Sequence, residues 1–305
     1  MSRNLQGQVL IALLWCSLVA PSGHSQLKDP HDQSGVPLEV QPTDPRLIKI
    51  VLVAGKPSHG PGEHEFFAGC ALLMKMLAQE PQVFPVMANE GWPNDPKTFA
   101  GARSIVFFMD GGAGHPILKA RRPELIQKLI DRGTGFVNLH YAVEYPKREG
   151  ERVLSWLGGY YETGYSVNPH WKAEIKTLPD HPITRGVHPF ALVDEWYYCI
   201  RFPVDMTGVT PILKAIPPDS TRFTPEAKAH PGREEILAWA FERPGGGRSF
   251  GFTGAHFHRN WKEENFRRLV VNAILWTAKV DVPPSGAHAV LAPGDLDKNL
   301  DRKAK

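Results

Sequence analysis

The stretch GFVNLHYAVEYP, residues 135 to 146, decides the fold that this sequence predicts. After its glycine the first half is mostly apolar, which is typical of a strand buried on both faces of a sheet. The run ends at His140 and Tyr141, and Pro146 terminates whatever follows. In open α/β sheets, ligands bind beyond the carboxyl ends of the strands. The stretch therefore predicts a central strand that brings a histidine and a tyrosine to a ligand site, with an ordinary turn as the alternative.

Alternating strands and helices are expected around this central strand. Apolar runs and helical spacing of apolar residues define strands at 47–55, 83–88 and 104–112, and helices at 66–77 and 123–132. Pro85 favours an edge position for the second of these strands, because proline cannot donate a backbone hydrogen bond. The order of the elements predicts an α/β sandwich, a mostly parallel sheet with helices on both faces.

The second half predicts extra antiparallel strands between turns rich in proline and glycine. They are HWKAEIK (170–176), EWYYCIRF (195–202), VTPILKAI (209–216), EILAWAFE (235–242) and RSFGFTGA (248–255). The segment PGGGR between the last two predicts a hairpin, and an amphipathic helix follows at 266–277. We expect one domain, residues 47–280, after a linker at 26–46 and before a polar tail at 281–305.

The net charge and the N-terminal segment limit the classes of protein to which this chain can belong. The net charge is +3 over 305 residues without a block of lysine and arginine, so we expect no nucleic-acid partner. Arg3 is the only charge in residues 1–25, and an apolar run at 9–20 is followed by small residues. This pattern predicts a secretory signal peptide over residues 1–25, with an N-terminal membrane anchor as the alternative. We therefore expect an exported protein, periplasmic or extracellular, whose mature chain has no membrane span.

Export would place Cys70 and Cys199 in an oxidising compartment, where a disulfide between them is one option. Cys70 lies on the apolar stripe of a predicted helix. We therefore expect two buried thiols rather than a disulfide.

Polar residues follow the first and third predicted strands. The loop AGKPSHGPGEHE lacks the Lys-Ser/Thr end of a phosphate loop, which leaves His59 and His64 to hold a polar ligand or a metal. Asp110 follows the third strand and suits sugar hydroxyls. The amides of Gly111 and Gly112 are expected to face an oxyanion. For each loop, an ordinary turn is the alternative.

The second half contributes further polar candidates. If VDEWYY is a strand, Glu195 and Tyr197 share one face, and a carboxylate beside a phenol suits a sugar. His170 precedes this segment. His256 and His258 follow the last strand and would share a face only if the chain there stayed extended.

Four motifs in order resemble the trehalose-utilisation (ThuA-like) family. They are KIVLVAGKPSHGPGEHE, GFVNLHYAV, HPITRGVHPFALVDEWYY and GAHFHRNWKEENFRRLVVNAILWTAK, which together span about residues 47–279. The resemblance implies a fold similar to class I glutamine amidotransferases, a flavodoxin-like sandwich. In those enzymes a cysteine nucleophile stands where this chain has His140, and a carboxylate stands where it has His258. Glutamine hydrolysis is excluded because neither cysteine lies near that strand tip in the sequence.

The resemblance implies an enzyme acting on oxidised (3-keto) disaccharides or glycosides. A 3-keto group acidifies the neighbouring C–H, so a base can remove that proton and expel the glycosidic oxygen. We expect His140 or His256 to be the base, with Glu195 assisting. The expected carbohydrate-binding residues are His59, His64, Asp110, Gly111, Gly112, Tyr141, His170, Tyr197 and His258.

Two questions stay open at this point. The sequence alone does not require a cofactor, but five histidines would suffice for a divalent metal, zinc or manganese: His59, His64, His140, His170 and His256. The alternative to an enzyme is a non-catalytic carbohydrate-binding protein that stacks sugars on Tyr160, Tyr161, Trp171, Trp196 and Tyr197.

Overall fold

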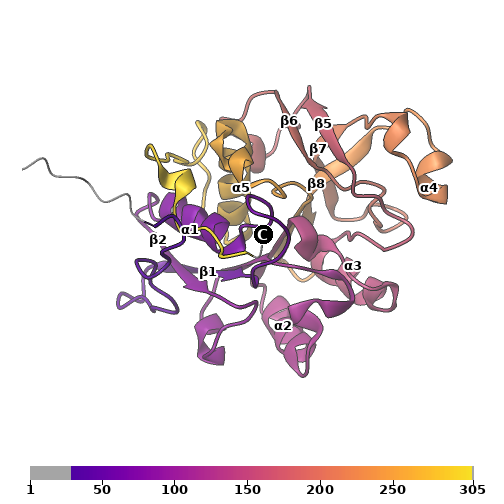
Figure 1. Cartoon of the computed structure of the whole chain (residues 1–305). Helices are drawn as coiled ribbons and strands as arrows, with labels where there is room; N and C mark the ends of the chain where they lie inside the picture. Colours follow the sequence, from indigo (N-terminus) through magenta and orange to yellow (C-terminus); the bar gives the residue numbers. More distant parts are fainter. Residues whose placement is uncertain (1–28, 304–305) are drawn as a thin grey trace, which may run out of the picture.

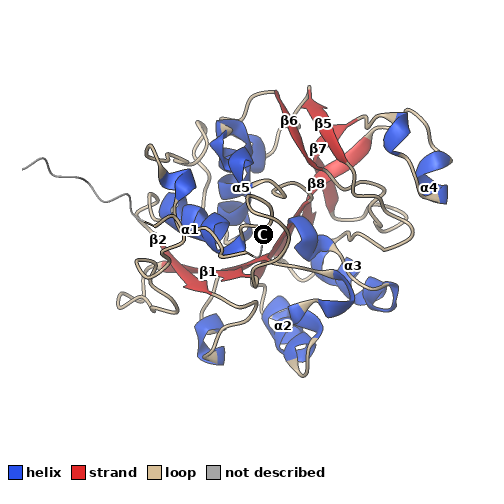
Figure 2. Ribbon diagram, in the orientation of Figure 1, coloured by secondary structure: helices blue, strands red, loops and turns tan. Residues whose placement is uncertain are grey.

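The computed structural model describes residues 29–303, so the predicted signal peptide lies outside the described residues. A seven-stranded sheet forms its centre, in the order β2-β1-β3-β4-β9-β8-β7 (Figures 1 and 2). The strands are β1 (Ile48–Ala54), β2 (Val83–Ala88), β3 (Ser104–Phe108), β4 (Gly135–Leu139), β7 (Val209–Ala215), β8 (Glu235–Glu242) and β9 (Arg248–Phe252). β1 to β4 and β9 pair in parallel, whereas β8 and β7 are antiparallel additions.

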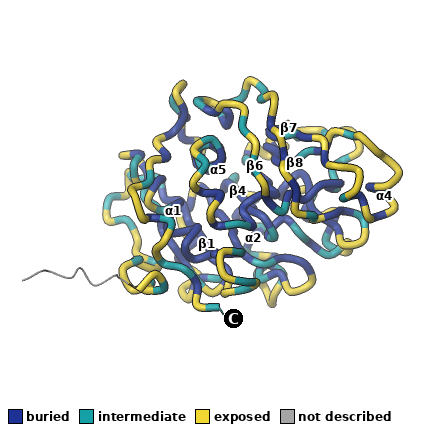
Figure 3. The backbone as a smooth tube through the Cα atoms, turned by 45° about the horizontal axis from the view of Figure 1, so that its top comes forward, coloured by how far each residue is buried: buried dark blue, intermediate teal, exposed yellow. Residues whose placement is uncertain are grey.

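Helices cover both faces of this sheet, as predicted. α1 (Phe66–Leu77) and α5 (Glu264–Thr277) lie on one face, and α2 (Arg122–Asp131) and α3 (Gly150–Leu157) on the other (Figure 1). Along β1, Ile50, Leu52 and Ala54 join the apolar cluster of α1 and α5. Val51 and Val53 join the opposite cluster. This alternation explains why the strand reads as a continuous apolar run. The α/β, mostly parallel architecture is confirmed, and Figure 3 shows the buried centre around β1 and β4.

The edges of the sheet agree with the sequence pattern. β2, which contains Pro85, is an edge strand. Leu38 bridges Met87 on its outer side, and the N–H of Glu39 donates to the Met87 carbonyl at 2.7 Å. Part of the segment expected as a linker therefore shields the β2 edge of the sheet. Elsewhere in the sheet, β8 and β9 form the predicted hairpin.

A separate two-stranded antiparallel sheet holds β5 (His170–Ile175) and β6 (Phe190–Glu195). The expected strand at 195–202 is wrong, because β6 ends where that strand should begin. Trp196 and Tyr198 are buried in one apolar cluster and Tyr197 in the other. Cys199 has a positive φ of 54°, which no regular strand adopts. The aromatic run is therefore an irregular connection that joins the two cores.

The chain after α5 lies against the domain. The side chains of Lys303 and Glu65 form an ion pair at 3.5 Å and are each 2% exposed. The N–H of Asp301 donates to Glu65 at 2.7 Å. The short helix α4 (Pro225–Lys228) lies at the right-hand edge of Figure 1, away from α1. Cys70 and Cys199 are buried free thiols. No helix within residues 29–303 has the length and apolar character to cross a membrane.

Candidate functional site

Three histidines and a glutamate meet beyond the carboxyl ends of the parallel strands. His140 directly follows β4, His64 precedes α1, and His256 lies in the loop after β9. Glu195 is the last residue of β6 and comes from the separate two-stranded sheet. One ligand atom from each of the four residues lies within 4.8 Å of the others. The parallel sheet explains this convergence, because the carboxyl ends of its strands share one edge.

The four ligand atoms are close to one another in nearly every pair. His64 Nε2 lies 3.0 Å from His140 Nε2 and 3.0 Å from His256 Nδ1, which are themselves 3.3 Å apart. Glu195 Oε2 lies 3.3 Å from the His140 nitrogen and 3.2 Å from the His256 nitrogen. These five short contacts would need five hydrogens, yet each of the three ring nitrogens can carry only one. Hydrogen bonds alone therefore do not satisfy the cluster.

The Nδ1 atoms of His140 and His64, which face away from the cluster, already have hydrogen-bond partners. His140 Nδ1 lies 2.9 Å from the carbonyl of Thr253, which can only accept. His64 Nδ1 lies 3.1 Å from Asp110 Oδ1. Each neutral ring therefore holds its hydrogen on Nδ1 and turns the lone pair of Nε2 towards the cluster. Burial lowers the pKa of His64, and neighbouring histidines lower it further, so protonation of His64 does not relieve the contact.

The backbone at these histidines is also unusual. His59, His64 and His140 have φ values of 60°, 45° and 53°, in the left-handed region that residues other than glycine rarely occupy. Such conformations cluster at functional sites, where the surrounding structure holds them. The strand tip of the opening stretch is therefore not an ordinary turn.

Asp194 positions His256 through the backbone. Its fully buried carboxylate accepts hydrogen bonds from the N–H groups of Ala255 (2.7 Å), His256 (3.1 Å) and its own neighbour Glu195 (2.9 Å). The N–H of Phe257 also donates to it at 3.3 Å. One carboxylate thus ties the end of β6 to the loop that carries His256. No sequence motif indicates this role for Asp194.

Glu195 is held in a defined orientation. Asn168 Nδ2 donates to Glu195 Oε1 at 3.0 Å, which leaves Oε2 for the two histidines. Burial opposes ionisation of Glu195, but the interactions with His140 and His256 outweigh it and hold its carboxyl pKa below the usual range. Burial by itself would lower the pKa of His256, and Glu195 reverses this and raises it. The Tyr197 hydroxyl lies 3.3 Å from His140 Nε2, so Glu195 and Tyr197 both contact His140, although Tyr197 lies beyond the end of β6.

A second, more accessible group lies beside the cluster. The Ser58 hydroxyl donates to Asp110 Oδ1 at 2.9 Å and lies 3.1 Å from His59 Nδ1. The exposed ring of His59 lies 3.6 Å, centroid to centroid, from that of His64. Burial lowers the pKa of His59 and raises that of Asp110. Ser58 lies within the first family motif but carries no chemical signal of its own there, and Asn168 lies outside the four motifs, so neither was predicted as a site residue.

The remaining candidates take other places. His170 is exposed, with its ring 5.0 Å from that of His256, and does not share in the four-atom cluster. Tyr141 flanks the site, with its ring 5.8 Å from that of His64. His258 is buried elsewhere, where its Nε2 contacts the Leu296 carbonyl at 3.0 Å. A 3-10 helix begins at His258, and His256 and His258 contact different parts of the molecule.

Two expectations about this region need correction. The Gly112 amide donates to the carbonyl of Glu144 at 2.9 Å, so it does not face an oxyanion. Gly111 serves close packing, because a Cβ there would lie 2.1 Å from the carbonyl oxygen of Tyr141. The aromatic residues expected to stack on sugars are all buried, at most 6% exposed, so they form no such platform: Tyr160, Tyr161, Trp171, Trp196 and Tyr197.

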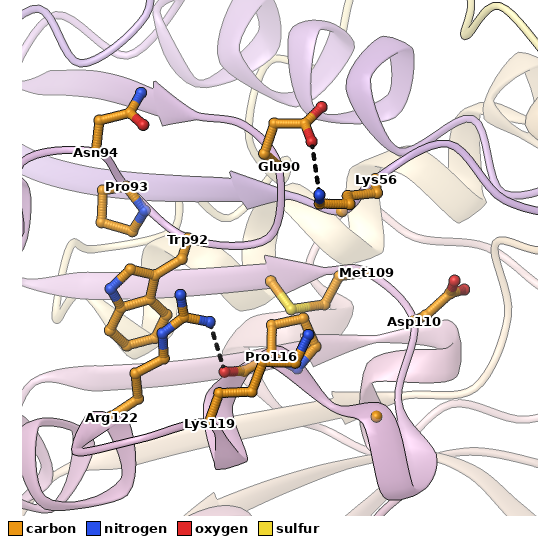
Figure 4. Close-up of a pocket in the computed structure, with 12 residues that line it drawn as sticks. Lys56, Glu90, Trp92, Pro93, Asn94, Met109, Asp110, Pro116, Lys119 and Arg122 are labelled. Carbon is orange, nitrogen blue, oxygen red and sulfur yellow. Dashed lines mark hydrogen bonds and ion pairs between the residues drawn. The ribbon is translucent and has the colours of Figure 1, made fainter.

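A cleft of about 580 Å³ opens next to Asp110. Figure 4 shows Asp110 at one end and Trp92 with Arg122 at the other. The loops after β1 and β3 and the start of α2 line it, so it also lies at the carboxyl edge of the sheet. This size is in the range of small-molecule sites.

The comparisons with known proteins identify the family and the fold. The profile of the Trehalose utilisation family, ThuA, matches residues 50–277, and the chain belongs to this family. A ThuA-like protein from Bacteroides uniformis ATCC 8492 is 16% identical, with a TM-score of 0.55 over 84% of this chain and 99% of that one. A ThuA-like protein from Parabacteroides merdae ATCC 43184 is 17% identical, with a TM-score of 0.55 over 83% of this chain and 99% of that one. These two structures share the fold. None of the curated proteins matches this chain.

Proposed function

We propose that this chain is a metal-dependent enzyme that cleaves the glycosidic bond of oxidised, 3-keto sugars. The observation that carries the proposal is the contact between His64 Nε2 and His140 Nε2 at 3.0 Å, with both Nδ1 atoms already committed. A cation between the rings turns two repelling lone pairs into two ligands. Family membership supports carbohydrate as the class of substrate.

The donor set fits zinc or manganese. Zinc binds imidazole nitrogens and carboxylate oxygens at about 2.0–2.1 Å, so neighbouring ligand atoms of a tetrahedral site lie about 3.3–3.4 Å apart. Five of the separations among the ligand atoms of His64, His140, His256 and Glu195 run from 3.0 to 3.3 Å. Outer partners also fit, because metal-bound histidines usually donate their second N–H to a carboxylate or carbonyl. Asp110 and Thr253 take that place for His64 and His140.

This arrangement gives the predicted catalytic residues a different task. His140, Glu195 and His256 hold the ion and are not the groups that transfer protons. When bound, such an ion is a Lewis acid that polarises a carbonyl oxygen. His170 and Tyr141 lie at the margin of the cluster, where they are placed to contact a sugar.

Groups for proton transfer lie beside the cluster. His59 is exposed and its lowered pKa keeps the ring neutral at pH 7, so it can accept the proton next to the ketone. Burial raises the pKa of the Tyr141 hydroxyl, which therefore stays protonated and can donate to a leaving oxygen. The elimination then balances: the base takes the proton next to the ketone, its electron pair forms a C=C bond as the C–O bond breaks, and the acid protonates the released oxygen.

The test measures metal and turnover on the same purified chain. We expect about one zinc or manganese ion per chain by mass spectrometry. Chromatography should show loss of 3-keto disaccharides with release of monosaccharide, and no loss of the unoxidised disaccharides. A chelator should abolish turnover, and added metal should restore it. Full turnover by metal-free protein would refute the metal, and thermal protection by sugars without any turnover would favour the binding protein.

A further inference from the structure

Three cationic and two acidic side chains line the cleft beside Asp110, and two of the cations have no carboxylate partner among the described residues. Lys119 and Arg122 line it, and within residues 29–303 neither forms an ion pair with Asp or Glu. Lys56 does pair with Glu90 at 3.3 Å, but both side chains are more than half exposed. Exposed ion pairs of this kind contribute little, so Lys56 is easily shared with a ligand.

Arg122 is held rigidly in this cleft. Its guanidinium lies 4.5 Å above the centre of the Trp92 ring, and Nη1 donates to the carbonyl of Pro116 at 2.8 Å (Figure 4). Trp92 in turn packs against Phe99 and Phe107. The other N–H groups of Arg122 have no acceptor among the described residues. A guanidinium fixed in this way binds a planar anion with little loss of side-chain freedom.

Asp110 links the cleft to the proposed metal site, because it lines the cleft and contacts His64 Nδ1 at 3.1 Å. A sugar unit in the cleft would therefore lie against a side chain that directly contacts the cluster of His64, His140, His256 and Glu195. Resting on the proposed function, we infer that the cleft is an anion subsite that selects acidic saccharides, those with a carboxylate or a phosphate ester on the unit bound by Arg122 and Lys119.

Binding of simple probes tests this subsite without turnover. We expect methyl glucuronide and glucose 6-phosphate to bind about tenfold more tightly than methyl glucoside, by calorimetry at low salt, because charged hydrogen bonds are the stronger ones. A preference for only one of the two anions identifies carboxylate or phosphate as the group recognised. Raising the salt concentration should weaken the anionic probes and leave methyl glucoside unchanged.

Matched variants locate the effect. Arg122→Gln and Lys119→Gln should each reduce the preference for the anionic probes from about tenfold to about threefold. Arg121→Gln, an exposed neighbour that does not line the cleft, should leave it unchanged. Lys119 is exposed, so its variant keeps the test valid if Arg122→Gln fails to fold. Equal binding of all three probes, or an equal loss in Arg121→Gln, would overturn the inference.

The two proposals fail separately. Metal content and cleavage of neutral 3-keto disaccharides are measured on the same variants. Retained metal and cleavage without anion preference would refute only the subsite. If the protein prefers the anionic probes but neither binds metal nor cleaves 3-keto disaccharides, only the proposed function is refuted.

Discussion

The Nε2 atoms of His64 and His140 lie 3.0 Å apart, although the hydrogen of each neutral ring is committed to Nδ1. This contact joins the start of α1 to the end of β4, two elements that are neighbours only in the folded chain. The same contact makes the metal proposal testable. If the two rings bind an ion, adding or removing metal should change the stability of the fold, whereas an ordinary hydrogen bond would not respond to metal.

Replacing His64 should remove the metal. His64→Ala should lower metal content from about one ion per chain to below about a tenth, since it deletes the ligand that contacts both other rings. His230→Ala, which alters an exposed histidine near α4, is the matched control. Mass spectrometry of both purified variants measures the difference. Equal metal content in the two variants would show that His64 is not a ligand.

Asp110→Asn should weaken metal binding without unfolding the protein. The amide no longer supplies a negative acceptor for His64 Nδ1, and loss of such an outer partner typically costs 10–100-fold in metal affinity. Competition with a chromogenic chelator measures the affinity. An unchanged affinity would mean that Asp110 serves the cleft alone.

Asp194→Asn should destabilise the domain. An amide nitrogen would replace one of the oxygens that accept four backbone N–H groups, so at least one buried donor would lose its acceptor. We expect a loss of about 2–4 kcal/mol in the free energy of unfolding, measured with urea. Asp180→Asn, at an exposed residue, should change it by less than about 0.5 kcal/mol.

Breaking the ion pair of Lys303 and Glu65 should loosen the loop that carries His64. Lys303→Met leaves the Glu65 carboxylate buried without its cation, which costs about 3–5 kcal/mol. Glu65→Gln combined with Lys303→Met should recover part of this loss, because no unpaired charge then remains. Thermal unfolding of the single and double variants tests the coupling. Equal stability of both would contradict it.

Asp301 should make stability depend on pH. Burial, and then the charge of Glu65, raise its pKa from 3.8 to about 6. The folded state therefore holds the proton more tightly than the unfolded chain. The stabilisation is complete below pH 3.8 and is lost as the pH rises through 6, by about 1–3 kcal/mol. Asp301→Asn should flatten melting temperatures between pH 4 and 7, whereas Asp297→Asn, at an exposed position, should not.

The central strands were predictable because each is buried on both faces and so reads as one apolar run. That pattern ends at Leu139, which is why His140 could be placed at a strand tip. The prediction of a strand at 195–202 is wrong because a strand-like pattern there does not come from a strand. Its aromatic side chains alternate as a strand would, but they bury into two different cores through an irregular backbone.

By itself, the sequence determined the parallel α/β sheet, its edge at Pro85 and the histidines at the strand tips, because burial leaves a local periodic pattern in the chain. Only the tertiary structure decided that His64, His140, His256 and Glu195 share one point and that His170 and His258 do not. Asp194 and the small β5–β6 sheet set that outcome through contacts between residues far apart in the sequence. Such contacts leave no periodic signal, so ligand atoms can be listed from a sequence but brought together only by the fold.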